Sequence, residues 1–292
     1  MTSSSHRPFE FYVASDLHFG ANARGNRSVE ALARHVCEHP ADALLLGGDL
    51  GGDPQTLAIC LQLFDRFEGV KMAVPGNHDV WLNGWPTQSS WALHEDLLPR
   101  VFEAFGFHPL HLKPLLVDTP EGPLGFVGSM GWYDYSFRDD IGADLSHYRA
   151  KTPPWGEHPI WNDARYARFP DFDDESLCAL LNERLAAQLA AVEAPRVVAL
   201  VHHLVTKALL VHPRFIVPRL WRFANAFLGS ERLGDTLRAD ARVKQVFCGH
   251  IHMERSARWD HAHVTALGGD YLQKQLIRAS AELTLDKRMF SP

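Results

Sequence analysis

Five short apolar runs recur along this 292-residue chain, and a polar residue able to bind a metal follows each of them. The runs cover residues 9–15, 43–48, 70–76, 196–201 and 243–249. Each is as long as a strand and apolar nearly throughout, which is typical of strands covered on both faces. Helix-like segments separate several of the runs, and this alternation predicts an α/β fold with largely parallel central strands.

Helix-start signals support this alternation at three places. The pair Asp53-Pro54 combines a capping residue with a proline at the first helical position. Asp173 and Asp174 open a long Ala/Leu-rich helix, and Ser28 is predicted to cap a helix over residues 28–39.

Two segments break the alternation. Residues 130–172 are rich in aromatic residues without a clear period, and a loop of that length is commonly a lid or a binding loop. Residues 206–229 are apolar and basic with interspersed prolines, which indicates short helices leading away from the sheet. We predict a single domain over residues 1–292, with a disordered start at residues 1–7.

Composition limits the classes of function. The net charge of −6 argues against a protein built around nucleic-acid binding. The four cysteines are scattered without C-x-x-C spacing, so we expect free thiols in a reducing compartment. The start of the chain lacks a leader pattern, and the chain has no apolar stretch of about 18 residues. These features predict a cytoplasmic protein without stable membrane insertion.

The residues that follow the five runs are the candidate site. They are Asp16 and His18, Asp49, Asn77 and His78, His202, and His250 with His252. Ligands of open α/β sheets bind at the carboxyl ends of the strands, so five runs would deliver these side chains to one edge. A single aspartate in such a place is usually a turn former, but agreement among five strand ends indicates a shared metal site.

The chemistry of this set restricts the metal. Carboxylate, amide and imidazole groups together suit Mn, Fe, Zn or Ni, and the absence of a thiolate from the set argues against a structural zinc site. Glycines come directly before three of the candidates, at Gly48, Gly76 and Gly249, where the chain turns sharply or another group approaches the backbone.

In their order and spacing these motifs resemble the calcineurin-like metallophosphoesterase superfamily. The matching pieces are Asp16-x-His18, Gly48-Asp49, Gly76-Asn77-His78-Asp79, His202 and Gly249-His250-x-His252. The resemblance implies a four-layer α/β/β/α sandwich of two mixed sheets flanked by helices. It also implies two divalent metal ions, with manganese favoured for activity. Asp49 would bridge the ions; Asp16, His18 and His252 would complete one site, and Asn77, His202 and His250 the other.

The resemblance further implies that a hydroxide held between the metals attacks phosphorus. His78 would be the general acid that protonates the leaving oxygen, and Asp79 would orient it. The chain departs from the family at His202-His203, where many relatives have a proline soon afterwards. We assign His202 as the ligand and leave His203 as a substrate or supporting residue. No arginine pair of the protein-phosphatase branch is recognisable, so phosphoprotein substrates are not expected.

The substrate would be selected by loops over the metals. Trp132 and Tyr133 are candidates for stacking on a base and Arg138 for binding a phosphate, although the aromatic residues could equally pack a satellite core. The leading hypothesis is a small phosphodiester or a nucleotide. The alternatives are a lipid-linked pyrophosphate hydrolase at the membrane surface, a nuclease, which the net charge disfavours, and a non-catalytic metal-binding scaffold. The sequence leaves the oligomeric state open.

Overall fold

The computed structural model describes residues 7–210 and 219–292 and contains two six-stranded sheets. The strands of the first sheet are β1 (Phe11–Ala14), β2 (Ala43–Leu46), β3 (Val70–Ala73), β4 (Phe107–Pro109), β11 (Lys274–Ala279) and β12 (Thr284–Phe290). The strands of the second are β5 (Leu115–Val117), β6 (Leu124–Ser129), β7 (Arg196–Val201), β8 (Val243–Cys248), β9 (Arg255–Arg258) and β10 (His263–Ala266). The orders are β12-β11-β1-β2-β3-β4 and β5-β6-β7-β8-β10-β9.

Both sheets are mixed, with parallel strands at their centres. Strands β1 to β4 run parallel, and β11 and β12 extend that sheet in antiparallel pairings. Strands β6, β7, β8 and β10 run parallel, with β5 and β9 antiparallel at the edges. The five runs seen in the sequence are β1, β2, β3, β7 and β8, and their carboxyl ends lie at corresponding edges of the two sheets.

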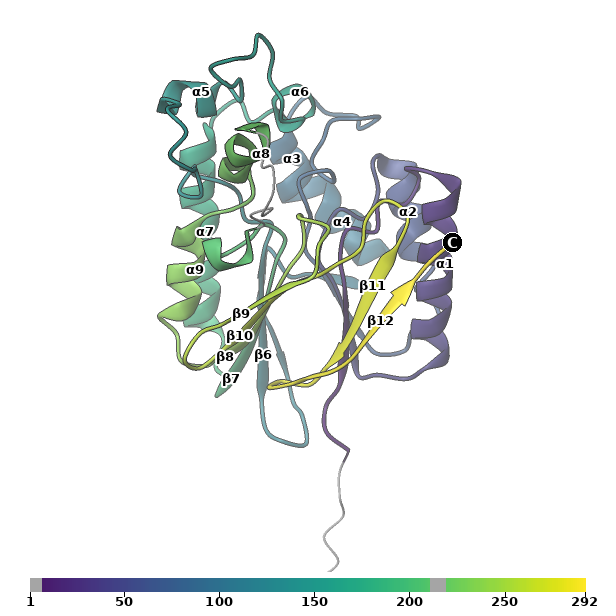
Figure 1. Ribbon diagram of the computed structural model, residues 1–292. Helices are drawn as coiled ribbons and strands as arrows, with labels where there is room; N and C mark the ends of the chain where they lie inside the picture. Colours follow the sequence, from purple (N-terminus) through teal and green to yellow (C-terminus); the bar gives the residue numbers. More distant parts are fainter. Residues whose placement is uncertain (1–6, 211–218) are drawn as a thin grey trace, which may run out of the picture.

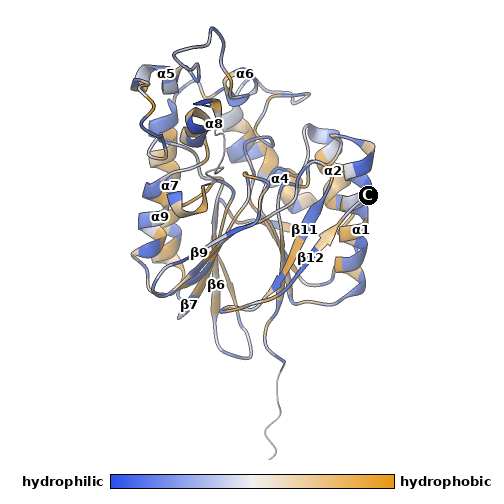
Figure 2. Cartoon of the chain, in the orientation of Figure 1, coloured by the Kyte–Doolittle hydropathy of each residue, from blue (hydrophilic) through white to orange (hydrophobic). Residues whose placement is uncertain are grey.

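Helices cover the outer face of each sheet, which confirms the predicted sandwich (Figure 1). The helices α1 (Ala23–Glu38) and α2 (Pro54–Gln62) flank the first sheet, and α7 (Asp174–Ala191) and α9 (Glu231–Arg238) flank the second. Orange, apolar residues concentrate on the strands and on the helix faces beside them in Figure 2. None of the helices within the described ranges is long and apolar enough to cross a membrane.

Two of the three predicted helix starts are confirmed. Asp53 and Asp173 each cap a helix, and each forms a reciprocal capping box with the residue at the third helical position. The prediction for Ser28 was wrong, because α1 already begins at Ala23. Asn22 caps this helix by accepting a hydrogen bond from the Gly25 amide at 2.8 Å. Ser28 is buried inside the helix and donates to the Leu272 carbonyl instead.

The aromatic segment 130–172 is folded rather than structureless. It contains α5 (Leu145–Arg149) and α6 (Asp163–Tyr166), which lie with α8 (Arg219–Ala224) at one end of the sandwich (Figure 1). Short 3₁₀-helices, Lys207–Leu209 and Asn225–Phe227, lie near α8 in the chain, as expected for 206–229. Residues 211–218 of that segment, and residues 1–6 of the start predicted to be disordered, lie outside the described residues.

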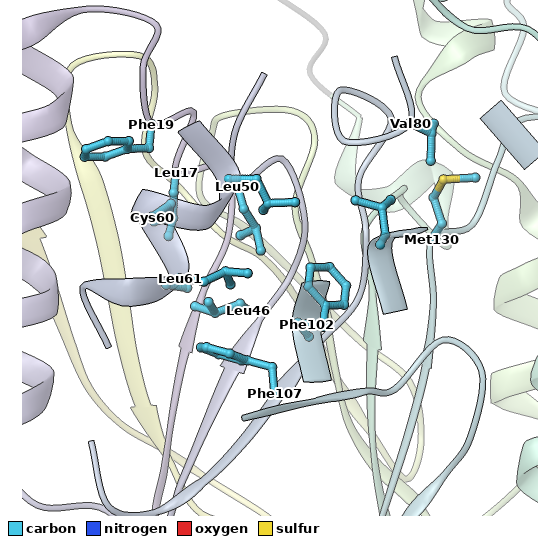
Figure 3. Packing of buried hydrophobic residues seen from close by; sticks show 14 of the residues in the cluster. Leu17, Phe19, Leu46, Leu50, Cys60, Leu61, Val80, Phe102, Phe107 and Met130 are labelled. Carbon is cyan, nitrogen blue, oxygen red and sulfur yellow. The ribbon is translucent and has the colours of Figure 1, made fainter. Parts of the chain in front are cut away.

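The remaining helical turns connect β3 to β4. They are α3 (Ser90–Ala92), a π-helical turn (Leu93–Leu97) and α4 (Leu98–Ala104). Phe102 of α4 and Phe107 of β4 belong to a large hydrophobic cluster that extends from the first sheet and its helices to the aromatic segment (Figure 3).

The loops that carry the candidate site are anchored in this core. Leu17, Leu50 and Val80 each directly neighbour a site residue in the sequence, and all three are fully buried. Figure 3 shows their side chains within the same cluster. Close packing of these three apolar side chains therefore fixes the backbone next to the polar residues at the sheet edge.

Candidate metal centre

The first half of the site gathers four side chains from three strand ends. Asp16, His18, Asp49 and His252 each offer a ligand atom within 4.8 Å of the others. The Nε2 atoms of His18 and His252 are 2.9 Å apart, and His252 Nε2 is 3.4 Å from Asp16 Oδ1. His18 Nε2 lies 3.7 Å from Asp49 Oδ2. Convergence of two imidazoles and two carboxylates at these distances creates a group that could hold a metal ion.

The second half of the site surrounds the amide of Asn77. Its Oδ1 atom is 3.2 Å from His202 Nε2 and 3.1 Å from His250 Nδ1. His202 Nε2 is also 3.5 Å from Asp49 Oδ1. The two carboxylate oxygens of Asp49 therefore face different halves of the site, which is the arrangement that a bridging carboxylate needs.

The orientation of His202 is set by the backbone. Its Nδ1 lies 2.8 Å from the Gly47 carbonyl, to which it donates when Nδ1 carries the proton. That tautomer leaves a free electron pair on Nε2, which is directed toward Asn77 and Asp49. Such a bond from the second ring nitrogen is the usual way in which a ligating imidazole is oriented.

The backbone at the site is strained. Within the described ranges, seven non-glycine residues have a positive φ, and five of them are site residues. These five are Asp16 (57°), His18 (44°), Asp49 (54°), His250 (75°) and His252 (55°). Non-glycine residues seldom adopt this left-handed conformation, and such residues cluster at functional sites.

The glycines before the site residues allow close backbone approach. A Cβ atom at Gly76 would lie 2.1 Å from Asp49 Oδ1. At Gly249 it would lie 2.1 Å from Ser15 Oγ and 2.5 Å from Asp16 Oδ2. Any larger residue at these positions must therefore displace a carboxylate of the site.

Gly249→Ala is therefore expected to weaken the binding of Mn²⁺ by about 10–100-fold, the usual effect of disturbing groups that support ligands. The added methyl group would push Asp16 Oδ2 out of place. Calorimetric titration with Mn²⁺ measures the effect. Gly52→Ala is the matched control, since among the described atoms none lies within 4 Å of its Cβ position. Equal affinities for the two variants would contradict the expectation.

Electrostatics at the site favours a cation. Burial lowers the pKa of His202 to about 3 and that of His78 to about 4, so both imidazoles are neutral at pH 7. Burial also lowers the pKa of His18 and His250 well below the ordinary value. Burial, followed by the charges of Asp16 and Asp79, raises the pKa of Asp49 well above its usual range.

The donor set fits a divalent metal. Neutral imidazole is the form that ligates metals, and the buried carboxylates provide negative charge that a cation would neutralise. His250 Nε2 is buried without a hydrogen-bond partner in the part of the chain that the structure describes.

His78 lies at the mouth of the site. Its Nε2 is 3.8 Å from Asp49 Oδ2, and its side chain is 21% exposed. The ring stacks on Trp81, with centroids 3.7 Å apart. It therefore rests on an aromatic wall and faces the same space as the two halves of the site.

The predicted pairing of Asp79 with His78 was wrong. Asp79 is buried, and its carboxylate accepts hydrogen bonds from four backbone amides, those of Asp49 (2.7 Å), Leu50 (2.9 Å), Gly51 (3.3 Å) and Gly76 (2.8 Å). Across the described ranges it has no hydrogen bond to the His78 ring. Because these amides already satisfy the carboxylate, Asp79 joins the loops after β2 and β3 instead of orienting the imidazole.

The residues predicted to bind substrate are mostly buried. Trp132 and Tyr133 are 1% and 0% exposed, and their ring centroids are 4.8 Å apart in a stacked arrangement. This burial agrees with the alternative that the aromatic residues pack a core. His203 is fully buried, with Nδ1 at 3.0 Å from the Met130 carbonyl and its ring 4.3 Å from that of His250. Arg138 is exposed and donates to the Tyr135 carbonyl.

Two residues of the site were missed from the sequence. Tyr271 is 42% exposed, and its ring stacks on His18 at 4.5 Å. It follows β10, a short run that ends in Gly268-Gly269, so the strand-end pattern could have found it. Asp163 accepts a hydrogen bond from Asn77 Nδ2 at 2.9 Å. It lies in the aperiodic aromatic segment, where no sequence signal marks it.

Comparison with known proteins agrees with this geometry. A family model described as calcineurin-like phosphoesterase matches residues 9–254. The structure resembles phosphopantetheinyl hydrolase from Mycobacterium tuberculosis, with a TM-score of 0.70, 18% identity and 89% of each chain covered. It also resembles a dimetal phosphatase from Danio rerio, with a TM-score of 0.50, 11% identity, and 98% of this chain and 99% of that chain covered.

These identities are low, so the structural likeness establishes the fold alone. No curated protein matches the sequence. The family model, in contrast, spans most of the chain and every residue of the two half-sites. The protein therefore belongs to the calcineurin-like phosphoesterase family, whose members are hydrolases with a binuclear metal centre.

Proposed function

We propose that this protein is a metal-dependent phosphoesterase that hydrolyses a small phosphodiester or a nucleotide. The observation that carries the proposal is the position of Asp49, whose two carboxylate oxygens face two separate groups of nitrogen and oxygen donors. Two divalent cations bound on either side of it would activate a water molecule and neutralise charge on the phosphoryl oxygens.

In this proposal the ligands would be divided between the two cations. Asp16, His18 and His252 would hold one, and Asn77, His202 and His250 would hold the other. The amide of Asn77 supplies an oxygen without adding charge beside the buried carboxylates. Manganese suits this mixture of carboxylate, amide and imidazole donors, and we propose it as the metal that supports activity.

His78 is proposed as the general acid for the leaving oxygen. Because burial lowers its pKa to about 4, the imidazole of the free protein is neutral at pH 7. A negatively charged phosphate bound beside the ring would raise that pKa and favour the protonated form.

The exposed ring of Tyr271 supports a substrate that carries an aromatic or apolar group next to its phosphate. It lies against His18 at the rim of the site and keeps much of its surface open. A nucleoside or a similar small group could stack there. The net charge of −6 disfavours a polymeric nucleic acid as the substrate.

A lipid-linked pyrophosphate is the second candidate substrate. Around α8, at the end of the sandwich, the side chains of Trp155, Leu220 and Trp221 are 42%, 45% and 38% exposed. Arg219 lies 4.5 Å above the Trp155 ring. Exposed aromatic and basic side chains of this kind suit a membrane surface.

A substrate panel tests the proposal. Metal-stripped protein reloaded with Mn²⁺ is expected to hydrolyse bis(p-nitrophenyl) phosphate faster than p-nitrophenyl phosphate, and EDTA is expected to stop both reactions. The panel should include nucleotide diesters and a lipid pyrophosphate in vesicles. Preference for the vesicle substrate would favour the second candidate. Failure of the metal-loaded protein to hydrolyse any of these phosphoesters would refute the proposal.

A further inference from the structure

We propose that Asp163 is a positioning residue that fixes the Asn77 amide with its oxygen toward His202 and His250. The inference rests on the proposed function in one respect, namely that Asn77 is a metal ligand. It gives the aromatic segment 130–172 a supporting role at the metal centre, which neither the motifs nor the family comparison assigns.

Asp163 is buried, with 3% of its surface exposed, and accepts four hydrogen bonds. Its Oδ1 accepts from Asn77 Nδ2 at 2.9 Å and from Trp81 Nε1 at 2.8 Å. Its Oδ2 accepts from the Tyr133 hydroxyl at 3.2 Å and from Trp161 Nε1 at 2.7 Å. A carboxylate has only acceptor atoms, so this position requires a donor from each neighbour.

This requirement selects one orientation of the Asn77 amide. With Nδ2 toward Asp163, the Oδ1 atom points at His202 Nε2 and His250 Nδ1, at 3.2 and 3.1 Å. Rotation of the amide by half a turn would place Oδ1 against the carboxylate and the NH₂ group toward the imidazoles. Two acceptors in contact inside the protein are disfavoured, so the carboxylate opposes the orientation that could not bind a metal. In the orientation that it favours, Asn77 Oδ1 and the unprotonated His202 Nε2 are both acceptors, a pair that a shared cation would satisfy.

The same carboxylate oxygen supports the general acid. Trp81 donates to Asp163 Oδ1, and the Trp81 ring is the surface on which His78 stacks. The other two donors, Tyr133 and Trp161, come from the aromatic segment itself. One side chain thus connects that segment to both a ligand and the proposed proton donor.

The test is the affinity of Asp163→Ala for Mn²⁺ alone, measured by calorimetric titration. One of the two ions is expected to bind about 10–100-fold more weakly, as is typical when the partner of a ligand is removed. The other ion, on Asp16, His18 and His252, is expected to keep its affinity within about threefold. Electron paramagnetic resonance provides a second readout, because two Mn²⁺ ions about 3.5–4 Å apart couple and a single ion does not.

Asp174→Ala is the matched control. The Asp174 carboxylate also accepts several hydrogen bonds, from Trp132, Tyr135 and Lys151. Its described contacts include none of the proposed ligands. A purely structural effect would appear in both variants as a lower melting temperature, whereas the selective loss of one Mn²⁺ is expected only for Asp163→Ala.

A double-mutant cycle tests whether Asp163 acts through Asn77. Adding Asp163→Ala to Asn77→Ala is expected to cause no further loss of Mn²⁺ affinity. If Asp163→Ala does not fold, Asp163→Asn replaces it in the cycle. The introduced amide has one acceptor oxygen and can no longer accept from all four donors of the Asp163 carboxylate. The site that contains Asn77 is then expected to lose about tenfold in affinity for Mn²⁺.

Wild-type affinity for both ions in the Asp163 variant, or a full additional loss in the Asn77→Ala background, would overturn the inference. Wild-type protein that binds two Mn²⁺ ions but hydrolyses no phosphoester would refute the proposed function and leave the positioning role intact. Wild-type protein that binds no Mn²⁺ would refute both.

Discussion

Asp49→Asn is expected to abolish hydrolysis and, at the same time, to stabilise the metal-free protein. The loss of activity follows because both half-sites share this carboxylate. The metals supply several kcal/mol of transition-state stabilisation, so kcat should fall by at least about 10³-fold.

The gain in stability follows from the charge of the side chain. Burial and the charges of Asp16 and Asp79 raise the pKa of Asp49, so its ionised form destabilises the folded state. A raised carboxyl pKa reduces stability above the pKa of the unfolded chain, about 4. The stability advantage of the Asp49→Asn variant should therefore be absent at lower pH and grow as the pH rises above that value. The introduced amide oxygen can still accept from the His78 backbone amide, as Asp49 Oδ1 does at 2.9 Å.

Thermal unfolding in EDTA and in Mn²⁺, together with elemental analysis, measures both effects. In EDTA the variant should melt above the wild type, and added Mn²⁺ should stabilise only the wild type. Asp53→Asn is a suitable control, because either residue caps a helix well and Asp53 lies at the start of α2. Retention of both metals by Asp49→Asn would show that Asp49 is not the shared carboxylate. A lower melting temperature of the variant in EDTA would contradict the expected stabilisation.

His78→Ala is expected to lose activity in proportion to how poor the leaving group is. An alkoxide needs a proton in the transition state, whereas a nitrophenolate leaves as a stable anion. General acid catalysis typically contributes about 10²–10⁴-fold, so the defect should reach that size on an alkyl diester and be much smaller on the nitrophenyl diester. Both metals should be retained, since His78 is not among the four side chains, Asp16, His18, Asp49 and His252, whose ligand atoms converge in the first half of the site.

The measurement is kcat on both esters together with metal content. His39→Ala is the control, because His39 is an exposed histidine at the end of α1. A defect of the same size on both esters would remove the proton-donor role, and loss of a metal would make His78 a ligand instead.

The sequence was sufficient for the fold and for the gathering of the candidate site residues because both depend on one repeated relation. A strand-sized apolar run predicts a buried strand, and the carboxyl ends of parallel strands meet at one edge. Asp16 and Asp49 come together for that reason, and His202 meets them from the end of β7 in the second sheet, although the three residues are far apart in the chain.

Contacts made by side chains within turns did not follow from spacing. Adjacency of His78 and Asp79 suggested a pair, yet the carboxylate turns to backbone amides. Asp163 could not be found, because its importance arises from one tertiary hydrogen bond to Asn77. The start of α1 was placed too late because Ser28 and Asn22 are both good caps, and only packing shows that Ser28 lies inside the helix.

Buried apolar residues alternate with site residues in the turns after the strands, and this alternation limits where residues can be inserted or deleted. Leu17 separates Asp16 from His18, and its side chain is fully buried while those of its neighbours face the site. Deletion or insertion of one residue there would exchange the two environments, placing a leucine among the polar groups and a carboxylate in the hydrocarbon core. Unlike a substitution, this change cannot be confined to one side chain. Length variation is therefore tolerable in exposed connections such as residues 118–123 between β5 and β6, and not in the short turns that follow the parallel strands.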